Sequence, residues 1–356
     1  MKGVCHLIHT FFCFKYSITF EFMKILVVRF SSIGDIVLTS PVVRCIHQQI
    51  PNAEIHFITK KSFESIVETN PFIHKTWAIE KSIDELIPQL KAEKFDFLVD
   101  LHNNIRTKSL IRKLGVPHAS FPKLHIEKWL LVNFKKPMKT NVHVVERYFK
   151  AVEKLQVVND NLPCDFFFQS EDEIDVATLG VESKKFVAFA IGAQFATKRM
   201  PISKMIEVVK QIQFPLVLAG GPMDKETAND IIKALPNQQI VNTCGEFSLR
   251  QSASIVKQAA VLLTHDTGLM HIASAFQIPI VSVWGNTVPA LGMYPYYPQN
   301  ENGFSIHEVN DLKCRPCSKI GFKSCPKKHF NCMNLQNAQA IADDVNVKFS
   351  LELTPH

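Results

Sequence analysis

Short apolar runs alternate with amphipathic stretches along most of the chain. The apolar runs are rich in β-branched residues, as strands are, and the stretches between them carry apolar residues at helical spacing. The run from Ile25 to Val28 is apolar at every position, which indicates a strand buried on both faces of a parallel sheet. The pattern therefore predicts an α/β fold.

The predicted elements form two groups separated by a polar, acidic segment. In the first group we predict strands at 25–30, 54–59, 76–79 and 95–101, and helices at 82–94, 106–114 and 143–155. In the second group we predict strands at 186–191, 216–219, 239–242, 261–264 and 280–283, and helices at 203–212, 225–235, 249–258 and 269–276. The segment 159–185 between the groups is predicted to be a linker with one short strand at 166–168.

Two such groups predict two doubly wound, Rossmann-like domains that face a central cleft. We place an N-terminal extension at 1–22, the first domain at 23–165, the second at 166–336, and a C-terminal helix and tail at 337–356. One continuous sheet is the alternative, and the acidic linker argues against it. Because ligands of such sheets bind beyond the carboxyl ends of the strands, the cleft is the expected active site.

Charge and composition narrow the choice of partners. The net charge of +7 fits an anionic substrate or a negatively charged membrane surface, and equally a slightly basic protein with neither. Lysine and arginine are scattered without interleaved aromatic residues, so we do not expect nucleic-acid binding. The sequence contains no uninterrupted apolar run of about 20 residues, so we do not expect a membrane-spanning helix. Residues 1–22 lack a signal-peptide core and are interpreted as an upstream extension, with a membrane-surface anchor as the alternative.

The first candidate site follows the first predicted strand, at Ser31-Ser32-Ile33-Gly34-Asp35. A small turn at a helix N-terminus lets the backbone approach a ligand. It lacks the three glycines of the dinucleotide fingerprint, which argues against a dehydrogenase. Asp35 would lie at the edge of the cleft, where a carboxylate can accept a proton from an attacking hydroxyl. Its alternative role is that of an acid in the first turn of a helix.

Two loops of the second half have the chemistry to bind phosphate. Lys198 follows the first strand of that half, and a basic side chain there can stabilise the charge of a leaving group. An exposed basic loop is the alternative. After the strand at 261–264, the turn Asp266-Thr267-Gly268 opens a helix whose free amides can donate to a diphosphate. An ordinary capped helix start is the alternative there.

Four of the nine cysteines form a cluster, Cys314-x2-Cys317-x7-Cys325-x6-Cys332. The first pair has the spacing of half a zinc knuckle, so the segment permits a structural zinc site. The second pair is spaced too widely for a standard zinc ribbon. Reduced thiols in a surface loop are therefore the interpretation we favour, since a cytosolic setting disfavours disulfides.

Taken together, these segments resemble the ADP-heptose:lipopolysaccharide heptosyltransferases, glycosyltransferase family 9. The resemblance rests on Ser31-Ser32-Ile33-Gly34-Asp35, on Lys198 with Pro201, and on the run from Asp266 through His271. The segment 279–285, followed by Thr287 and Pro289, extends the last motif. The cysteine cluster also looks like one found in many members. The match runs in order from about Met23 to Cys332, and its specificity comes from the combination of motifs.

The resemblance implies a GT-B fold and a cytoplasmic, inverting glycosyltransferase that needs no cofactor and no catalytic metal. It implies Asp35 as the general base, in a loop with Ser32 and Gly34 on the acceptor side. The implied donor-binding residues are Lys198, Gln194, Asp266, Thr267, Gly268 and His271. The implied partners are a sugar nucleotide and a lipid A-linked saccharide acceptor, reached by peripheral contact with the inner face of the inner membrane.

One departure from the family leaves the donor open. Ala193 and Gln194 stand where well-known members carry threonines, so Gln194 or backbone amides would replace those hydroxyl contacts to phosphate. A transferase or epimerase that uses a UDP- or GDP-linked sugar is therefore an alternative. A non-catalytic protein that binds nucleotide sugars is another, and the presence of both Asp35 and Lys198 argues against it.

Overall fold

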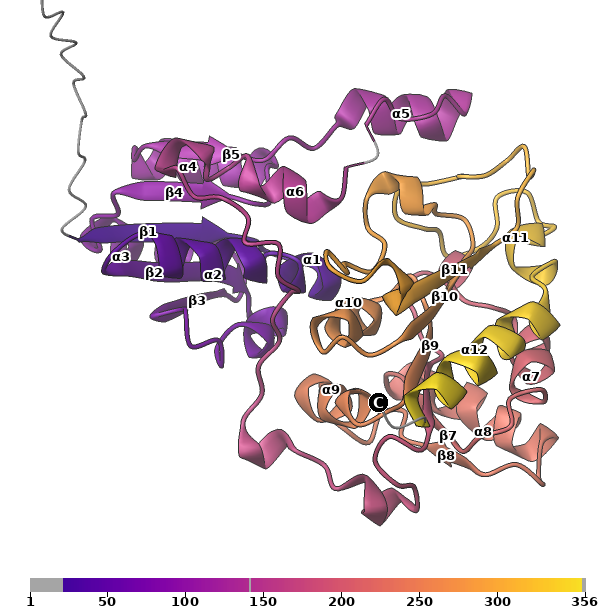
Figure 1. The fold of residues 1–356 in the computed structure, drawn as a ribbon. Coiled ribbons are helices and arrows are strands. Elements are labelled where there is room, and N and C mark those ends of the chain that lie inside the picture. The colour runs from indigo at the N-terminus through magenta and orange to yellow at the C-terminus, as the bar shows by residue number, and fades with distance from the viewer. Residues whose placement is uncertain (1–21, 141, 354–356) are drawn as a thin grey trace, which may run out of the picture.

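The computed structural model describes residues 22–140 and 142–353, and in that part the chain folds around two separate parallel sheets (Figure 1). The first sheet has the strand order β3-β2-β1-β4-β5 and the second β11-β10-β9-β6-β7-β8. We call the parts built on them the first lobe and the second lobe. Two sheets confirm the predicted α/β architecture and exclude a single continuous sheet. The N-terminal extension lies outside the described residues.

The first lobe contains the first five strands. They are β1 (Met23–Val28), β2 (Ala53–Lys60), β3 (Lys75–Ile79), β4 (Phe97–Asp100) and β5 (His118–Ser120). Its helices are α1 (Ile33–Val37), α2 (Ser40–Gln49), α3 (Ile87–Ala92), α4 (Ile105–Leu114), α5 (His125–Phe134) and α6 (Val144–Phe149). Pro41 lies in the first turn of α2, where its missing N–H costs nothing, so it marks the start of a second helix.

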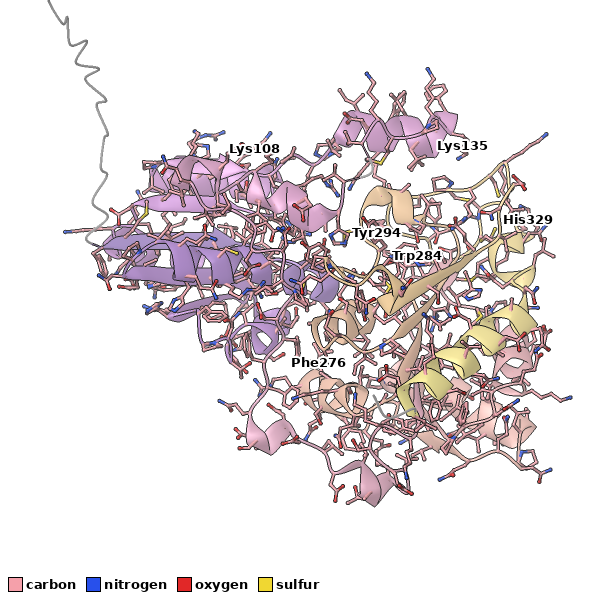
Figure 2. All side chains as sticks on the ribbon, viewed as in Figure 1. Lys108, Lys135, Phe276, Trp284, Tyr294 and His329 are labelled. Carbon is pink, nitrogen blue, oxygen red and sulfur yellow. The ribbon has the colours of Figure 1, made fainter. Side chains whose placement is uncertain are left out.

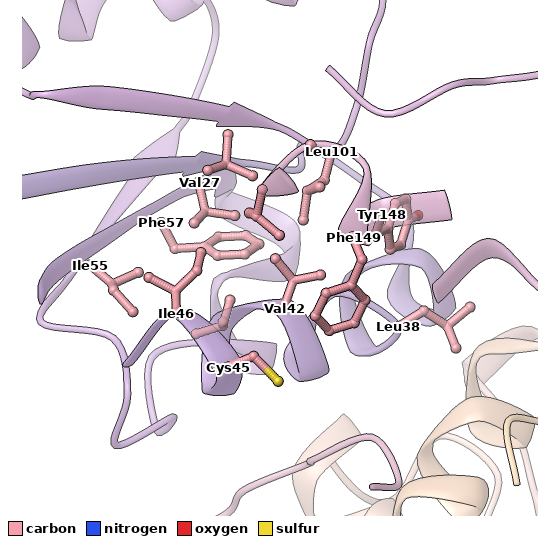
Figure 3. Close-up of a cluster of buried hydrophobic side chains, with 14 of the residues drawn as sticks. Val27, Leu38, Val42, Cys45, Ile46, Ile55, Phe57, Leu101, Tyr148 and Phe149 are labelled. Carbon is pink, nitrogen blue, oxygen red and sulfur yellow. The ribbon is translucent and has the colours of Figure 1, made fainter. Parts of the chain in front are cut away.

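The central strand of the first sheet is buried on both faces because its side chains alternate between two apolar clusters. Val27 packs with Val42 of α2 and with Tyr148 and Phe149 of α6 on one face (Figure 3). Leu26 packs in a second cluster, together with residues of α3 and α4, on the other face. This two-sided burial fixes β1, and so fixes the place where the turn that carries Asp35 begins.

The second lobe contains the remaining six strands. They are β6 (Val187–Ala190), β7 (Leu216–Ala219), β8 (Ile240–Asn242), β9 (Val261–His265), β10 (Ile280–Trp284) and β11 (Phe304–Glu308). Its helices are α7 (Ile202–Val209), α8 (Lys225–Ala234), α9 (Leu249–Lys257), α10 (Gly268–Ala275), α11 (Asn331–Asn334) and α12 (Ala338–Leu353). Helices α7, α8 and α12 supply the core on one face of the sheet, and α9 and α10 supply it on the other.

The structure differs from the predicted elements in three places. Residues 166–168 form no strand: Phe166 is buried in the core of the first lobe, but the backbone there pairs with no neighbouring strand. The helix predicted over 143–155 ends at Phe149 and continues as 3-10 turns. Helix α5 and the edge strands β5 and β11 were not predicted; the two strands are short and carry little periodic apolar signal, whereas the apolar residues of α5 do have helical spacing.

The segment between the lobes is held by ion pairs to an arginine of each lobe. Arg44 of α2 donates from Nε to Asp160 at 2.8 Å and also pairs with Asp165. Arg250 of α9 pairs with Asp172, further along the same segment, at 2.7 Å. The segment is therefore anchored at both ends by arginine–carboxylate pairs. The domain boundary between 165 and 166 stays a prediction.

Candidate active site

Asp35 lies at the start of α1, immediately beyond the carboxyl end of β1. Ser32 is the N-cap residue, and its hydroxyl donates to Asp35 Oδ2 at 2.7 Å. Arg29, which follows the strand, pairs with Asp35 Oδ1 at 2.5 Å. Burial alone would raise the pKa of Asp35, but the charge of Arg29 and the hydrogen bonds from Ser32 outweigh it and hold that pKa below its ordinary value. Asp35 is therefore an oriented, ionised carboxylate at neutral pH.

Arg29 is a part of this site that the sequence pattern did not single out. Its guanidinium is buried and also donates from Nε to the carbonyl of Ser31 and from Nη1 to the carbonyl of Leu101. These bonds fix the guanidinium between β1 and the end of β4. The sequence shows only that an arginine directly follows an apolar strand. This position indicates a buried charge that needs a partner, but it does not indicate which residue the partner is.

The second charged pair lies at the carboxyl ends of β6 and β9. Lys198 Nζ and Asp266 Oδ2 are 2.5 Å apart, and both side chains are largely buried. Thr287, which lies beyond β10, donates from its hydroxyl to the same Asp266 oxygen at 2.9 Å. Three separate segments of the sequence therefore meet at Asp266, which orients Lys198 and balances its charge.

The two helix starts that carry these pairs pack against each other through two glycines. A Cβ added to Gly34 of α1 would lie 2.2 Å from His271 Cδ2, and one added to Gly268 of α10 would lie 2.6 Å from Ile33 Cγ2. Any side chain at either position would overlap the opposite helix. In Figure 1, α1 and α10 face each other where the two lobes meet. The glycines are therefore what allows the two turns to approach.

His271 lies at the centre of this contact and connects the candidate residues from both lobes. Its imidazole is buried, and burial lowers its pKa to about 4, so the ring is neutral at pH 7. The charges that act on it are those of Asp266, Asp35 and Lys198. Its Nδ1 makes no hydrogen bond within the described part of the chain. The structure therefore brings Asp35, Lys198, Asp266 and His271 into one electrostatic neighbourhood.

The N-terminus of α10 is open toward this neighbourhood. Thr267 is its N-cap residue, with an extended backbone and no side-chain capping bond, and its hydroxyl lies 3.2 Å from that of Thr264. The first amides of the helix, starting at Gly268, are thus not capped by that side chain. A helix N-terminus of this kind favours an anionic ligand.

The loop that carries Lys198 is held from two sides. His265 is fully buried at the end of β9, and its Nε2 accepts a hydrogen bond from the backbone of Met200 at 3.1 Å. Thr197 exchanges hydrogen bonds with the backbone of Phe322, in the cysteine-containing loop. Sequence reasoning missed His265, because a histidine at the end of an apolar strand carries no signal of its partner.

The donor-binding role of Gln194 stays a prediction. Gln194 is exposed and makes no side-chain hydrogen bond within the described residues. A carboxylate that was not predicted, Asp224, lies closer to the strand ends: it pairs with Arg199 at 3.1 Å and accepts from the amide of Gly221 at 2.9 Å. A Cβ on Gly192 would lie 2.3 Å from Asp224 Oδ2, so this loop also needs its glycine.

Basic side chains surround the side of the site next to α5. Burial lowers the pKa of Lys128 to about 7, and the positive charges of Arg147, Lys319 and Lys123 lower it further, while Asp35 opposes them. Burial and Arg29 lower the pKa of Lys123 as well. Mutual repulsion of this kind shows that several cations are gathered close to Asp35 without enough carboxylates to balance them.

A cavity of about 720 Å³ lies between α5 and the second lobe. Its lining is mostly apolar and comes from both lobes: Leu131, Lys135, Pro137, Met138, Val288, Pro289, Ala290, Ile306, His307, Glu308, Asn310 and Pro316. None of the candidate residues lines it. It adjoins them through Val288, which follows the threonine bonded to Asp266. The cavity therefore lies between the lobes, and its lining is one residue along the chain from Thr287, which contacts Asp266.

The cysteines of the cluster lie within electrostatic reach of one another, and Cys314 Sγ is 3.8 Å from His329 Nε2, so a structural zinc site there stays a prediction. Among the described residues, the set of metal-ligand atoms that gathers within 4.8 Å is that of Glu54, His56 and Glu93. That set is already occupied, because Lys24 pairs with both glutamates and Trp77 donates to His56 Nδ1. Cys314, Cys317, Cys325 and Cys332 are free thiols.

Residues 83–322 match the model of glycosyltransferase family 9 (heptosyltransferase), which is well over half of the chain. The chain belongs to glycosyltransferase family 9. It is therefore a glycosyltransferase by family, as the motifs predicted. The matched range includes Lys198, Asp266 and His271 but begins after Asp35, so the placement of Asp35 rests on the structure of the first lobe.

Individual relatives agree with the family model over most of their length. Lipooligosaccharide heptosyltransferase 2 of Haemophilus ducreyi is 24% identical over 75% of this chain and 85% of its own. Lipooligosaccharide heptosyltransferase 2 of Campylobacter jejuni is 25% identical over 91% of this chain and 98% of its own. The structure of the ADP-heptose LPS heptosyltransferase II of Escherichia coli has a TM-score of 0.69 at 21% identity, covering 93% of this chain and all of that one. This likeness shows the GT-B fold of the family 9 chain.

Proposed function

We propose that this family 9 chain transfers a heptose from ADP-heptose to an inner-core saccharide of lipopolysaccharide, with inversion at the anomeric carbon and without a cofactor. Family membership supports glycosyl transfer, and the names of the relatives support the heptose, the ADP carrier and the lipopolysaccharide acceptor. The observation that carries the proposal is the meeting of Asp35, Lys198 and Asp266 around His271.

In this proposal Asp35 acts as the general base on the acceptor hydroxyl. Its depressed pKa keeps it ionised. Oδ2 accepts from both the amide and the hydroxyl of Ser32, so Oδ1, which pairs with Arg29, is the oxygen that keeps a lone pair for the proton. The acceptor oxygen attacks the anomeric carbon, its proton passes to Asp35, and the bond to the diphosphate oxygen breaks. A single displacement of this kind inverts the configuration at that carbon.

Lys198 and the N-terminus of α10 stabilise the departing diphosphate. Without donor, the ammonium of Lys198 is balanced by Asp266 at 2.5 Å. A diphosphate beside the first amides of α10 competes for Lys198, while the hydroxyl of Thr287 keeps Asp266 in place. The positive charge and the oriented amides are in place before the reaction, which is the arrangement that stabilises developing charge most effectively.

The basic side chains next to Asp35 fit an anionic acceptor. Lys123, Lys128 and Lys319 repel one another in a partly buried site, so an acceptor that carries carboxylates or phosphates would relieve that repulsion. We place this work at the cytoplasmic face of the inner membrane. None of the helices in the described part of the chain is both long and apolar enough to cross a bilayer.

A donor panel with product analysis tests the proposal. The purified chain is incubated with ADP-heptose, UDP-linked and GDP-linked sugars, with and without a heptose-deficient lipopolysaccharide acceptor, and products are read by mass spectrometry. We expect a gain of one heptose on the acceptor and release of ADP only when acceptor is present, with the inverted anomer by NMR. If sugar is transferred from a UDP- or GDP-linked donor and not from ADP-heptose, the proposed donor is wrong. If the donor sugar is epimerised in the absence of acceptor, the proposed transfer reaction is wrong.

A further inference from the structure

Helix α5 stands away from the body of the protein. In Figure 1 it lies at the outer edge of the molecule, away from both sheets. Of its ten residues only Leu131 is buried. Its C-cap residue, Lys135, holds its end to the second lobe by donating from Nζ to the carbonyl of Pro316 at 2.7 Å. The helix is therefore anchored at one end and presents most of its surface outward.

The outward face of α5 is apolar. At about 100° per residue, Trp129, Ile126, Leu130 and Phe134 fall within an arc of about 140°. Ile126 is 72% exposed, Trp129 50% and Phe134 59%. The rings of Trp129 and Phe134 contact each other edge to face, with centroids 5.2 Å apart. Large apolar side chains that gather on one exposed face mark a surface that meets another apolar phase.

The inward face of the same helix faces the interlobe cavity and the basic side chains near Asp35. Leu131 and Lys128 lie on the side opposite Ile126, with Leu131 lining the interlobe cavity and Lys128 within electrostatic reach of Asp35. The apolar outer face therefore cannot turn inward without removing both from their places. It is free for a partner while the helix still lines the site.

Basic side chains follow the apolar face at the C-terminal end of α5. The segment 123–139 contains five lysines and one glutamate. Lys136 and Lys139 are exposed and make no ion pair within the described residues. Lys108 of α4, a helix without acidic residues, lies within electrostatic reach of His125 at the start of α5. Figure 2 shows Lys108 on α4 and Lys135 on α5 along the same edge of the molecule.

We propose that α5 docks the protein on an anionic phospholipid bilayer, with Ile126, Trp129 and Phe134 inserted at the headgroup boundary and the lysines that follow the helix in contact with lipid phosphates. An exposed apolar face that includes a tryptophan and is followed by exposed lysines has the chemistry of an interfacial helix. The charge selects an anionic surface over a neutral one. The inference rests on the proposed function in one respect: a lipid-anchored acceptor would place the Asp35 site close to that surface.

Trp129 provides a built-in probe for this docking. The chain has three tryptophans, and the other two, Trp77 and Trp284, are buried. Addition of phosphatidylcholine–phosphatidylglycerol vesicles to the full chain should shift the fluorescence to shorter wavelength and make it quenchable by lipids brominated in the acyl chain. Vesicles of phosphatidylcholine alone should have a much smaller effect. Unchanged emission with anionic vesicles would overturn the proposal.

Vesicle flotation of variants tests the two parts of the surface separately. Ile126→Ser with Phe134→Ser should weaken binding about tenfold or more, because two inserted side chains are lost while the Trp129 probe stays. Lys136→Gln with Lys139→Gln should weaken it about 25-fold at low salt, about fivefold for each charge. The matched controls, Val347→Ser with Leu351→Ser on the exposed side of α12, should bind like the unaltered chain. Equal binding by all three variants would overturn the proposal.

Two further measurements separate this proposal from its rivals. If the face of α5 instead joins two copies of the chain, sedimentation velocity will show a dimer that the Ile126→Ser, Phe134→Ser variant lacks, and vesicle binding will be absent. Activity of that variant on a water-soluble, delipidated acceptor should match the unaltered chain. The docking proposal and the proposed transferase activity therefore fail or hold independently.

Discussion

The turns that carry Asp35 and Asp266 are built alike but held differently. Each follows a buried parallel strand, opens a helix, pairs an aspartate with a basic side chain of its own lobe at 2.5 Å, and contains a glycine against which the opposite helix packs. Asp35 is held by Arg29 and Ser32, both within six residues of it. Asp266 is held by Lys198 and Thr287, from two distant loops.

Because their aspartates are held differently, the two turns suit different steps of the proposed reaction. A locally fixed carboxylate beside a buried arginine keeps its geometry whatever binds, which suits a residue that must accept a proton at a fixed place. A lysine that reaches Asp266 from another loop can exchange that carboxylate for a diphosphate, which suits a residue that must bind and release a donor. The difference therefore supports the proposed acceptor role of the first turn and the proposed donor role of the second.

Replacement of Asp35 should have the largest effect. Asp35→Asn keeps the shape of the side chain but removes its basicity, so kcat should fall about 10²- to 10⁴-fold. ADP binding, measured by calorimetry, should stay within about twofold, since the donor contacts lie in the other turn. Weak ADP binding with normal turnover of bound donor would reverse the assignment of the two turns.

The local turn was largely predictable and the distant one was not. Asp35, Ser32 and Gly34 lie within one short motif, so their grouping could be inferred from the order of residues alone. The partnership of Lys198, Asp266 and Thr287 depends on three strand ends meeting at one edge of the sheet, which the predicted strands imply only in outline. Helix α5 was not predicted, although Ile126, Trp129, Leu130 and Phe134 have helical spacing; the sequence does not tell that this apolar face is exposed and not buried.

Disruption of the glycine contact between the turns should have the second largest effect on activity. Gly34→Ala places a Cβ 2.2 Å from the ring of His271, so α1 and α10 must separate and the Asp35 site must shift relative to the donor. A displacement of this size should lower kcat/KM about 100-fold. Gly221→Ala is the matched control, since its nearest neighbour would be 3.8 Å away, and it should be nearly silent in the same assay. Equal activity of the two variants would show that the close approach is not needed for turnover.

Lys198→Ala should affect the donor turn alone. Loss of the ammonium also leaves Asp266 unpaired beside the diphosphate, so ADP should bind about 10- to 100-fold more weakly by calorimetry. Asp266→Asn added to Lys198→Ala should restore part of that affinity, because the repulsion is removed. Lys204→Ala, which loses only an ion pair within α7, is the matched control. A double variant that binds ADP no better than Lys198→Ala would mean that the two residues do not share the diphosphate.

The smallest effect should be a shift of the pH dependence of kcat/KM when the hydroxyl of Ser32, in the turn that carries Asp35, is removed. The folded-state pKa of Asp35 is depressed, so its charged form is lost only as pH falls through that low value. Ser32→Ala removes the hydroxyl that donates to Oδ2 at 2.7 Å, which stabilises the carboxylate less and raises its pKa. The acid limb of kcat/KM should therefore move to higher pH, by at most about one unit. Ser31→Ala, whose side chain does not contact Asp35, should leave the limb in place. A limb that stays fixed in Ser32→Ala would show that this hydroxyl orients Asp35 without setting its basicity.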